Sequence, residues 1–160
     1  ATRVMRKHRL AECLLVQVLG LPWEEAHAEA CRWEHVISDA VERRIMELLD
    51  HPTTSPYGNA IPGLMELLPQ TEFSAPEAGE VLALARIGEG EATRVVICRI
   101  AEPIQDDPEV MSALRRVGAM PGATVMAQRR ASGISIARGG EAAELSTTVA
   151  GYVIVQATTT

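Results

Sequence analysis

One stretch organises the first half of the sequence: Ala26-His27-Ala28-Glu29-Ala30-Cys31-Arg32-Trp33-Glu34-His35. The pattern predicts a helix that begins near residue 23 and runs to about residue 36. At about 100° per residue, its four potential metal ligands fall on an arc of roughly 100°. These ligands are His27, Cys31, Glu34 and His35. Two imidazoles, a thiolate and a carboxylate on one helical face are costly to hold together without a cation, so this face predicts a metal site.

A second pair of potential ligands precedes this stretch. Leu10 and Val18 belong to an apolar stripe with helical spacing, and Gly20 ends the predicted helix. His8 and Glu12 are spaced i and i+4 on this helix, so they face the same side. If the two helices pack side by side, six nitrogen, oxygen and sulfur donors converge. An ordinary pair on a helix surface has the same spacing, and this alternative stays open for His8 and Glu12.

The donor types narrow the choice of metal. A mixture of imidazoles, carboxylates and one sulfur suits Fe²⁺, Co²⁺, Ni²⁺ or Zn²⁺. A structural zinc site usually has more thiolates, and a site for Mg²⁺ or Ca²⁺ avoids cysteine. The single thiolate of Cys31 therefore favours a borderline transition metal.

The rest of the chain predicts a third helix, a turn-rich tail and a separate β domain. Ser38 is a predicted N-cap of a helix that runs to about Asp50. Residues 51–63 are rich in proline and glycine, which excludes a helix there. From about residue 80, five short β-type runs are separated by glycine-rich turns, and one helix interrupts them near 108–117.

These patterns predict an α+β chain with two parts. A three-helix dimerisation and metal-binding domain is expected over residues 1–68, with its Pro-rich tail at about 51–68. A linker is expected over 69–79, followed by a small SH3-like β-barrel domain over 80–160. Three short helices with prominent apolar stripes seldom bury all their apolar surface alone, so pairing with a second copy is expected.

Composition limits the function classes. The 160 residues carry a net charge of −6 at pH 7, and their basic residues form no long block. Such a surface binds phosphate backbones poorly, so this stretch by itself is not a DNA-reading module.

Cys13, Cys31 and Cys98 form no C-x-x-C pair, which predicts free thiols and a cytoplasmic location. No apolar run approaches the ~18 residues of a membrane span, so no membrane partner is expected. The chain opens inside a helical pattern without an initiator Met, which we interpret as a cut through a longer protein, with a processed natural terminus as the alternative.

Three segments carry a resemblance to a known family. They are Val4-Met5-Arg6-Lys7-His8-Arg9-Leu10-Ala11-Glu12, Glu29-Ala30-Cys31-Arg32-Trp33-Glu34-His35-Val36 and Ser55-Pro56-Tyr57-Gly58-Asn59-Ala60-Ile61-Pro62-Gly63-Leu64. They closely resemble the DtxR/IdeR family of iron-dependent transcriptional repressors. Gly20-Leu21-Pro22-Trp23-Glu24-Glu25 resembles the iron-dependent-regulator branch in particular. The match is near-continuous over residues 1–64, whereas residues 80–160 match mainly in pattern.

The resemblance implies two metal sites and one anion site. An ancillary metal site would use side chains from both domains, and a primary, activating site would use ligands near the end of the second helix. A further primary-site ligand is a Met of the family's N-terminal domain. The implied residues are His8, Glu12, His27, Glu102 and Gln105 for the ancillary site, Cys31, Glu34 and His35 for the primary site, and Arg9, Ser55 and Asn59 for the anion. Ordinary turn chemistry remains the alternative for Ser55 and Asn59.

The resemblance also implies cofactor and partners. Fe²⁺ is the implied cofactor, and Co²⁺, Ni²⁺, Zn²⁺ or Mn²⁺ is expected to replace it in vitro. The chain is expected to form a homodimer, and the parent protein to bind operator DNA through an N-terminal winged helix-turn-helix domain that this chain lacks. Metal would then favour one arrangement of the DNA-reading domains. In the family, the SH3-like domain can bind the Pro-rich segment between the domains, which here resembles Ser55 to Leu64.

Two other function classes remain as alternatives. A metal-dependent hydrolase also combines His, Glu and an open coordination position, but the sequence has no H-E-x-x-H motif and no convincing nucleophile–base pair. The chain is therefore not expected to be an enzyme. The third alternative is an interaction module, in which the SH3-like domain binds a partner and the helices only dimerise.

Overall fold

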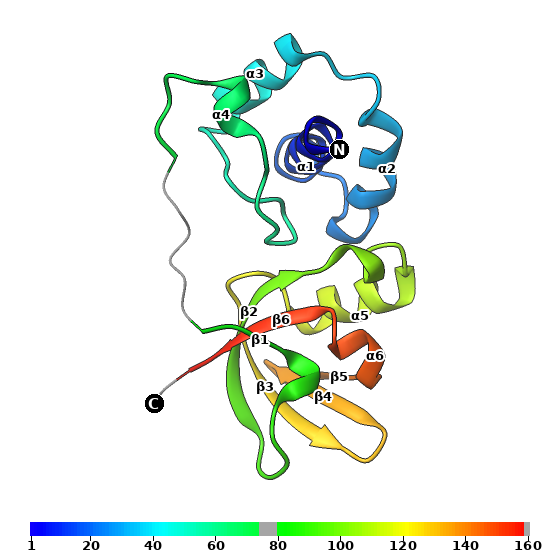
Figure 1. Cartoon of the computed structure of the whole chain (residues 1–160). Helices are drawn as coiled ribbons and strands as arrows, with labels where there is room; N and C mark the ends of the chain where they lie inside the picture. Colours follow the sequence, from blue (N-terminus) through cyan, green and yellow to red (C-terminus); the bar gives the residue numbers. More distant parts are fainter. Residues whose placement is uncertain (74–79, 159–160) are drawn as a thin grey trace. The chain divides into compact units, whose positions relative to one another are not determined.

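The structure is a computed structural model that describes residues 1–73 and 80–158 (Figure 1). It divides into two compact units, Ala1–Pro76 and Glu77–Thr160. The first unit is helical and the second carries a six-stranded sheet, which confirms the predicted α+β class. Most of the expected linker over 69–79 lies outside the described residues. No helix in the described residues is long and apolar enough to cross a lipid bilayer.

The first unit is built around α1 (Thr2–Gln17), which packs against both α2 (Ala26–Trp33) and α3 (Asp39–Leu48). A short 3-10 helix, η1 (Trp23–Glu25), precedes α2. A single turn, α4 (Leu64–Leu67), follows residues 51–63, which are called the Pro-rich segment below. Apolar side chains from α1, α3, α4 and the Pro-rich segment form the core. Its buried members are Leu10, Cys13, Ile45, Met46, Ile61, Leu64 and Leu67.

The second helix is shorter than the sequence pattern predicts. The chain leaves the helix at Glu34, whose backbone N–H still donates to Ala30 O at 3.0 Å. The β-branched residues Val36 and Ile37, together with Ser38, the N-cap of the next helix, disfavour continuation of α2. Glu34 and His35 therefore both follow α2 instead of lying within it, and the side chain of His35 is 70% exposed.

The cap of α3 is confirmed, but its end is earlier than predicted. The Ser38 Oγ accepts a hydrogen bond from the backbone of Val41 at 3.2 Å. The helix ends at Leu48 rather than near Asp50. Pro52 follows two left-handed residues, Asp50 and His51, each with φ 57°. Proline disfavours helical geometry in the residue before it, so the helix does not continue through His51.

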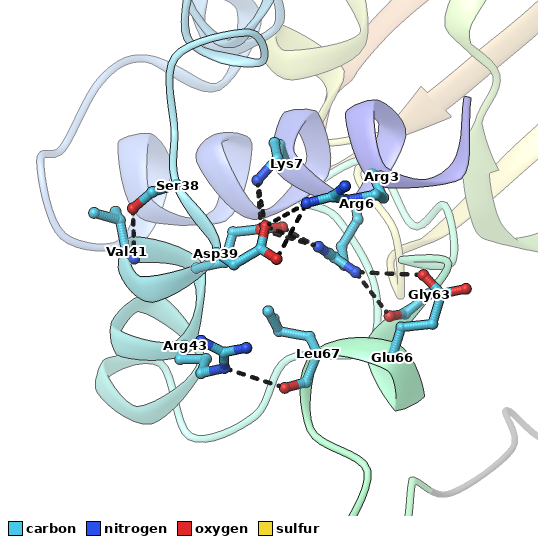
Figure 2. Close-up of polar contacts among 11 residues, drawn as sticks. Arg3, Arg6, Lys7, Ser38, Asp39, Val41, Arg43, Gly63, Glu66 and Leu67 are labelled. Atoms are coloured by element: carbon cyan, nitrogen blue, oxygen red, sulfur yellow. Dashed lines mark hydrogen bonds and ion pairs between the residues drawn. The ribbon is translucent and has the colours of Figure 1, made fainter.

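Ion pairs join α1 to α3, and Figure 2 shows Arg3, Arg6 and Lys7 of α1 directed toward Asp39 of α3. Arg6 donates to both carboxylate oxygens of Glu42, with Nε–Oε1 and Nη2–Oε2 distances of 2.7 and 3.0 Å. The Lys7 Nζ donates to the same carboxylate at 2.7 Å. Arg6 also donates to Gly63 O at 3.1 Å, which connects these helices to the end of the Pro-rich segment. Asp39, at the start of α3, accepts from Lys7 at 3.0 Å.

The second unit contains an antiparallel sheet in the order β1-β6-β2-β3-β4-β5. Its strands are β1 (Leu82–Ala83), β2 (Thr93–Ile100), β3 (Thr124–Arg130), β4 (Gly133–Arg138), β5 (Glu141–Leu145) and β6 (Val153–Ala157). Alternate side chains of β2 are buried, as in a sheet with one face on the core. The predicted SH3-like class holds for this unit, with six strands instead of the expected five.

The helix of this unit is where the sequence places it. α5 (Pro108–Val117) starts at Asp107, whose Oδ1 accepts from the backbone of Glu109 and Val110 at 3.1 and 3.2 Å. It ends at Gly118, which has φ 80°, a conformation that favours glycine. Two 3-10 turns, η2 (Leu84–Arg86) and η3 (Glu102–Ile104), and a last single turn, α6 (Thr147–Ala150), complete the unit.

Arg129 has a structural role that the sequence did not predict. From the sequence alone, Arg129 and Arg130 are most simply interpreted as a solvated pair before a turn. In the structure the Arg129 Nε donates to Ile87 O at 3.0 Å, and its guanidinium also donates to Ala85 O. Arg129 therefore fastens the segment after β1 to β3, because that segment's carbonyls have no strand to pair with.

Candidate metal centre

Three buried side chains from α1 and α2 meet at one point. The His8 Nε2 lies 3.1 Å from the His27 Nδ1 and 3.2 Å from the Glu12 Oε2. The third edge of this triangle, from His27 Nδ1 to Glu12 Oε2, is 3.3 Å. The exposed fractions of His8, Glu12 and His27 are only 3%, 1% and 5%. Convergence of the two helices is thus observed, and His8 and Glu12 do not form a mere pair on a helix surface.

The triangle has the size of a metal-ligand set. Bonds of about 2.0–2.2 Å to a tetrahedral or octahedral ion separate neighbouring ligand atoms by roughly 2.8–3.6 Å. Two imidazole nitrogens at 3.1 Å also need a proton or a cation between them, because two lone pairs repel. The residues present therefore fit a divalent metal ion coordinated by His8, Glu12 and His27.

The second nitrogen of each histidine faces a residue of the predicted primary site. The His8 Nδ1 is 2.8 Å from the Glu34 Oε2. The His27 Nε2 is 3.7 Å from the Cys31 Sγ, and His8, His27 and Cys31 have ligand atoms within 4.8 Å of one another. The other Glu34 oxygen, Oε1, lies 3.3 Å from the His35 Nε2. Carboxylates that contact the second nitrogen of a metal-bound histidine fix its orientation and tautomer.

Burial and charge act in opposite directions on His8. Burial lowers the pKa of the His8 imidazole, but hydrogen bonds and charge from Glu12 and Glu34 outweigh it, so the pKa is raised. The two carboxylates therefore stabilise a positive charge at this position, as they would stabilise a bound cation.

The residues predicted to hold an anion lie on α1 and in the Pro-rich segment. Arg9, on α1, donates through Nη1 to Ala60 O in the Pro-rich segment. In that segment the Ser55 Oγ accepts from the backbone N–H groups of Tyr57 and Asn59 at 3.2 and 3.3 Å. Ser55 therefore acts in the structure as a turn-forming residue, and anion binding at Arg9, Ser55 and Asn59 stays a prediction.

The two candidates from the second unit lie on either side of one turn. Glu102 begins η3 and Gln105 ends it. The Gln105 Nε2 donates to Ile100 O at 2.8 Å, and Gln105 is only 4% exposed. Its buried Oε1 has no hydrogen-bond partner among the described residues. A buried amide oxygen without a partner is costly, and a metal-ligand role for Glu102 and Gln105 stays a prediction.

The sequence interpretation missed the role of Tyr57, a residue of the Pro-rich segment whose side chain is fully buried. Its hydroxyl donates to Trp23 O at 2.6 Å and accepts from the backbone N–H of His27 at 3.1 Å. Burial and the charge of Glu12 raise the pKa of this hydroxyl, so it remains a protonated donor. A tyrosine among turn residues gave no sequence signal for this contact with a metal-ligand helix.

Comparison with known proteins identifies the family. Residues 1–63 match the domain described as "Iron dependent repressor, metal binding and dimerisation domain". The Diphtheria toxin repressor of Corynebacterium glutamicum is 41% identical over 157 residues, which cover 98% of this chain and 67% of the relative. The chain belongs to the iron-dependent repressor family. The Iron-dependent repressor IdeR of Mycobacterium leprae is 49% identical over 133 residues, which cover 83% of this chain and 57% of IdeR.

Solved structures agree with this assignment. A structure described as a manganese-dependent transcriptional repressor in complex with manganese has a TM-score of 0.77 and 27% identity, and the match covers 99% of this chain and 71% of that one. The IdeR of T. acidophilum has a TM-score of 0.76 and 25% identity. The chain spans little more than half the length of the mycobacterial iron-dependent repressors that it matches. Its first 63 residues are the family's metal-binding and dimerisation region.

Proposed function

We propose that this chain is the metal-sensing and dimer-forming part of an iron(II)-dependent transcriptional repressor. The observation that carries the proposal is the buried triangle of His8, Glu12 and His27, with edges of 3.1–3.3 Å. The family relationship supports a role in repression, since its relatives include an iron-dependent repressor and a diphtheria toxin repressor. Neighbouring structures are described with Mn²⁺, Zn²⁺ or Cd²⁺, so the preference for Fe²⁺ is part of the proposal.

The residues of the centre explain how metal occupancy would change the unit. A bound ion supplies positive charge where two imidazoles and a carboxylate converge. His8 and Glu12 lie on α1 and His27 lies on α2, so shared ligation holds these two helices in one arrangement. The Glu34 carboxylate, which contacts the His8 Nδ1, extends this order to the end of α2. Cys31, Glu34 and His35 are proposed to form the activating site together with a ligand from the N-terminal domain.

Dimerisation and DNA binding complete the proposal. The first unit leaves several large apolar side chains exposed, namely Val18, Leu19, Val36, Val41, Leu48 and Met65. Burial against a second copy of the chain would remove these side chains from water. Operator DNA would be bound by the N-terminal domain of the parent protein, and the metal-loaded helices would set the spacing of its two DNA-reading domains.

An anaerobic Co²⁺ titration tests the metal site, with visible absorption as the readout. We expect His8→Ala to remove one binding component and Cys31→Ala to remove the thiolate-to-metal charge-transfer band. His51→Ala is the matched control, because His51 is exposed and outside the centre. Binding that is unaffected by His8→Ala, or reduced equally by His51→Ala, would contradict the assignment of the centre.

A further inference from the structure

The Pro-rich segment is anchored to both helices that carry the buried triangle. An isolated β-bridge joins Thr54 to Ala60 and closes the segment into a compact loop, residues 53–61, which we call the docking loop. On the α1 side, the Cys13 Sγ donates to Thr54 O at 3.4 Å. Just before α2, the Nε1 of Trp23 in η1 donates to Pro56 O at 3.0 Å. The loop therefore bridges two helices that sequence order separates from it.

The central anchor of the docking loop is Tyr57. Its ring packs against the Trp23 ring with a centroid distance of 5.0 Å. Its hydroxyl accepts from the backbone N–H of His27, in the first turn of α2, and donates to Trp23 O. The first turn of a helix has no intrahelical acceptors for its N–H groups, so this hydroxyl satisfies a donor that burial would otherwise leave without a partner.

The backbone N–H that donates to the Tyr57 hydroxyl belongs to His27, a residue of the metal centre. The His27 side chain must keep its Nδ1 within 3.1–3.3 Å of the other two ligand atoms, and its position follows from its own backbone. A displacement of a few tenths of an ångström at the start of α2 would change both distances. The docking loop is thus fixed to the backbone of the ligand that α2 contributes by the hydrogen bond from the His27 N–H, and the same hydroxyl donates to Trp23 O just before α2.

We propose that the Tyr57 hydroxyl is a positioning group for the metal ligand His27, so that docking of the loop and metal binding stabilise each other. This inference rests on the proposed metal-sensing function and adds a second element that responds to the metal. The coupling is reciprocal by thermodynamic necessity: whatever the docked loop adds to metal affinity, the metal adds to loop docking. Any partner that takes up the released loop would favour the metal-free state.

The experiment compares Co²⁺ affinity and the Co²⁺ d–d spectrum in the unaltered 160-residue chain and in Tyr57→Phe. The substitution removes one oxygen atom and leaves the ring in place. Loss of a group that orients a ligand typically lowers metal affinity by 10–100-fold, and we expect about tenfold here because His27 stays present. We also expect the d–d band to shift, since the ligand geometry changes. Tyr152→Phe, in the second unit with a 38% exposed side chain, is the matched control and should change neither quantity.

A second measurement needs no substitution at Tyr57. Trp33→Phe leaves Trp23 as the chain's single indole, and its N–H is the donor to the docking loop. We expect Zn²⁺ to slow hydrogen exchange of this indole N–H, by up to the factor by which the docked loop raises metal affinity. Equal Co²⁺ affinity in Tyr57→Phe and the unaltered chain, or indole exchange that Zn²⁺ leaves unchanged, overturns the inference while the proposed function stands. Failure of the unaltered chain to bind Co²⁺ overturns both.

Discussion

The buried pair of Arg6 and Glu42 allows a quantitative prediction for Glu42→Gln. Both side chains are almost completely buried, at 2% and 0% exposure, and three hydrogen bonds reach the Glu42 carboxylate. Removing one partner of a buried pair costs about 3–5 kcal/mol, because the other charge stays buried without compensation. Asp39 and Glu66 remain 3.6 and 3.8 Å from the Arg6 guanidinium, so we expect the lower end of this range, about 3 kcal/mol.

Urea unfolding followed by tryptophan fluorescence measures this loss, because both tryptophans lie in the first unit. Urea is uncharged and does not screen the ion pair, as guanidinium would. The matched control is Glu47→Gln on the same helix, where the exposed pair with Arg44 is worth less than about 1 kcal/mol. A loss below about 1 kcal/mol for Glu42→Gln, or equal losses in the two variants, would refute the reasoning.

Three further predictions address other parts of the chain. Hydrogen bonding from Lys7 contributes most to lowering the pKa of Asp39. The stability due to Asp39 is therefore complete above about pH 4 and is lost as pH falls towards the lowered pKa. Asp39→Asn should reduce the pH dependence of urea midpoints in that window. A Cβ at Gly133 would overlap a backbone carbonyl oxygen of β5, so Gly133→Ala should destabilise the second unit by on the order of 3 kcal/mol in calorimetry. Alkylation at pH 7 should label the exposed Cys31 and spare Cys13, because burial raises the pKa of the Cys13 thiol to about 12. Mass spectrometry of peptides measures the labelling, and preferential labelling of Cys13 would contradict this prediction.

Elements with strong local signals were predicted from the sequence. α5 combines an Asp N-cap, a proline in its first turn and a glycine at its end, and the structure reproduces its bounds. Ser38 likewise marks the start of α3. β5 was missed because Glu141–Leu145 consists of Glu, Ala and Leu, which favour a helix; pairing with β4 imposes the extended conformation there.

The candidate site was predictable in its ligands and not in its connections. Helical spacing placed His8 beside Glu12 and His27 beside Cys31, and the packing of α1 on α2 brought the pairs together. The contact of His8 with Glu34 depends on where α2 ends, and end positions are poorly encoded in local sequence. The Tyr57 hydroxyl reaches His27 across thirty positions of sequence, through the fold of a loop that has no regular pattern.

The most direct test of the central claim is anomalous diffraction at the iron absorption edge, from crystals of this chain grown anaerobically with Fe²⁺. We expect an iron peak between the His8 Nε2, the Glu12 Oε2 and the His27 Nδ1, about 2.0–2.2 Å from each ligand atom. Soaking the same crystals with a chelator should remove the peak and leave the three side chains in place. An ordered iron peak elsewhere, with none inside this triangle, would contradict the account.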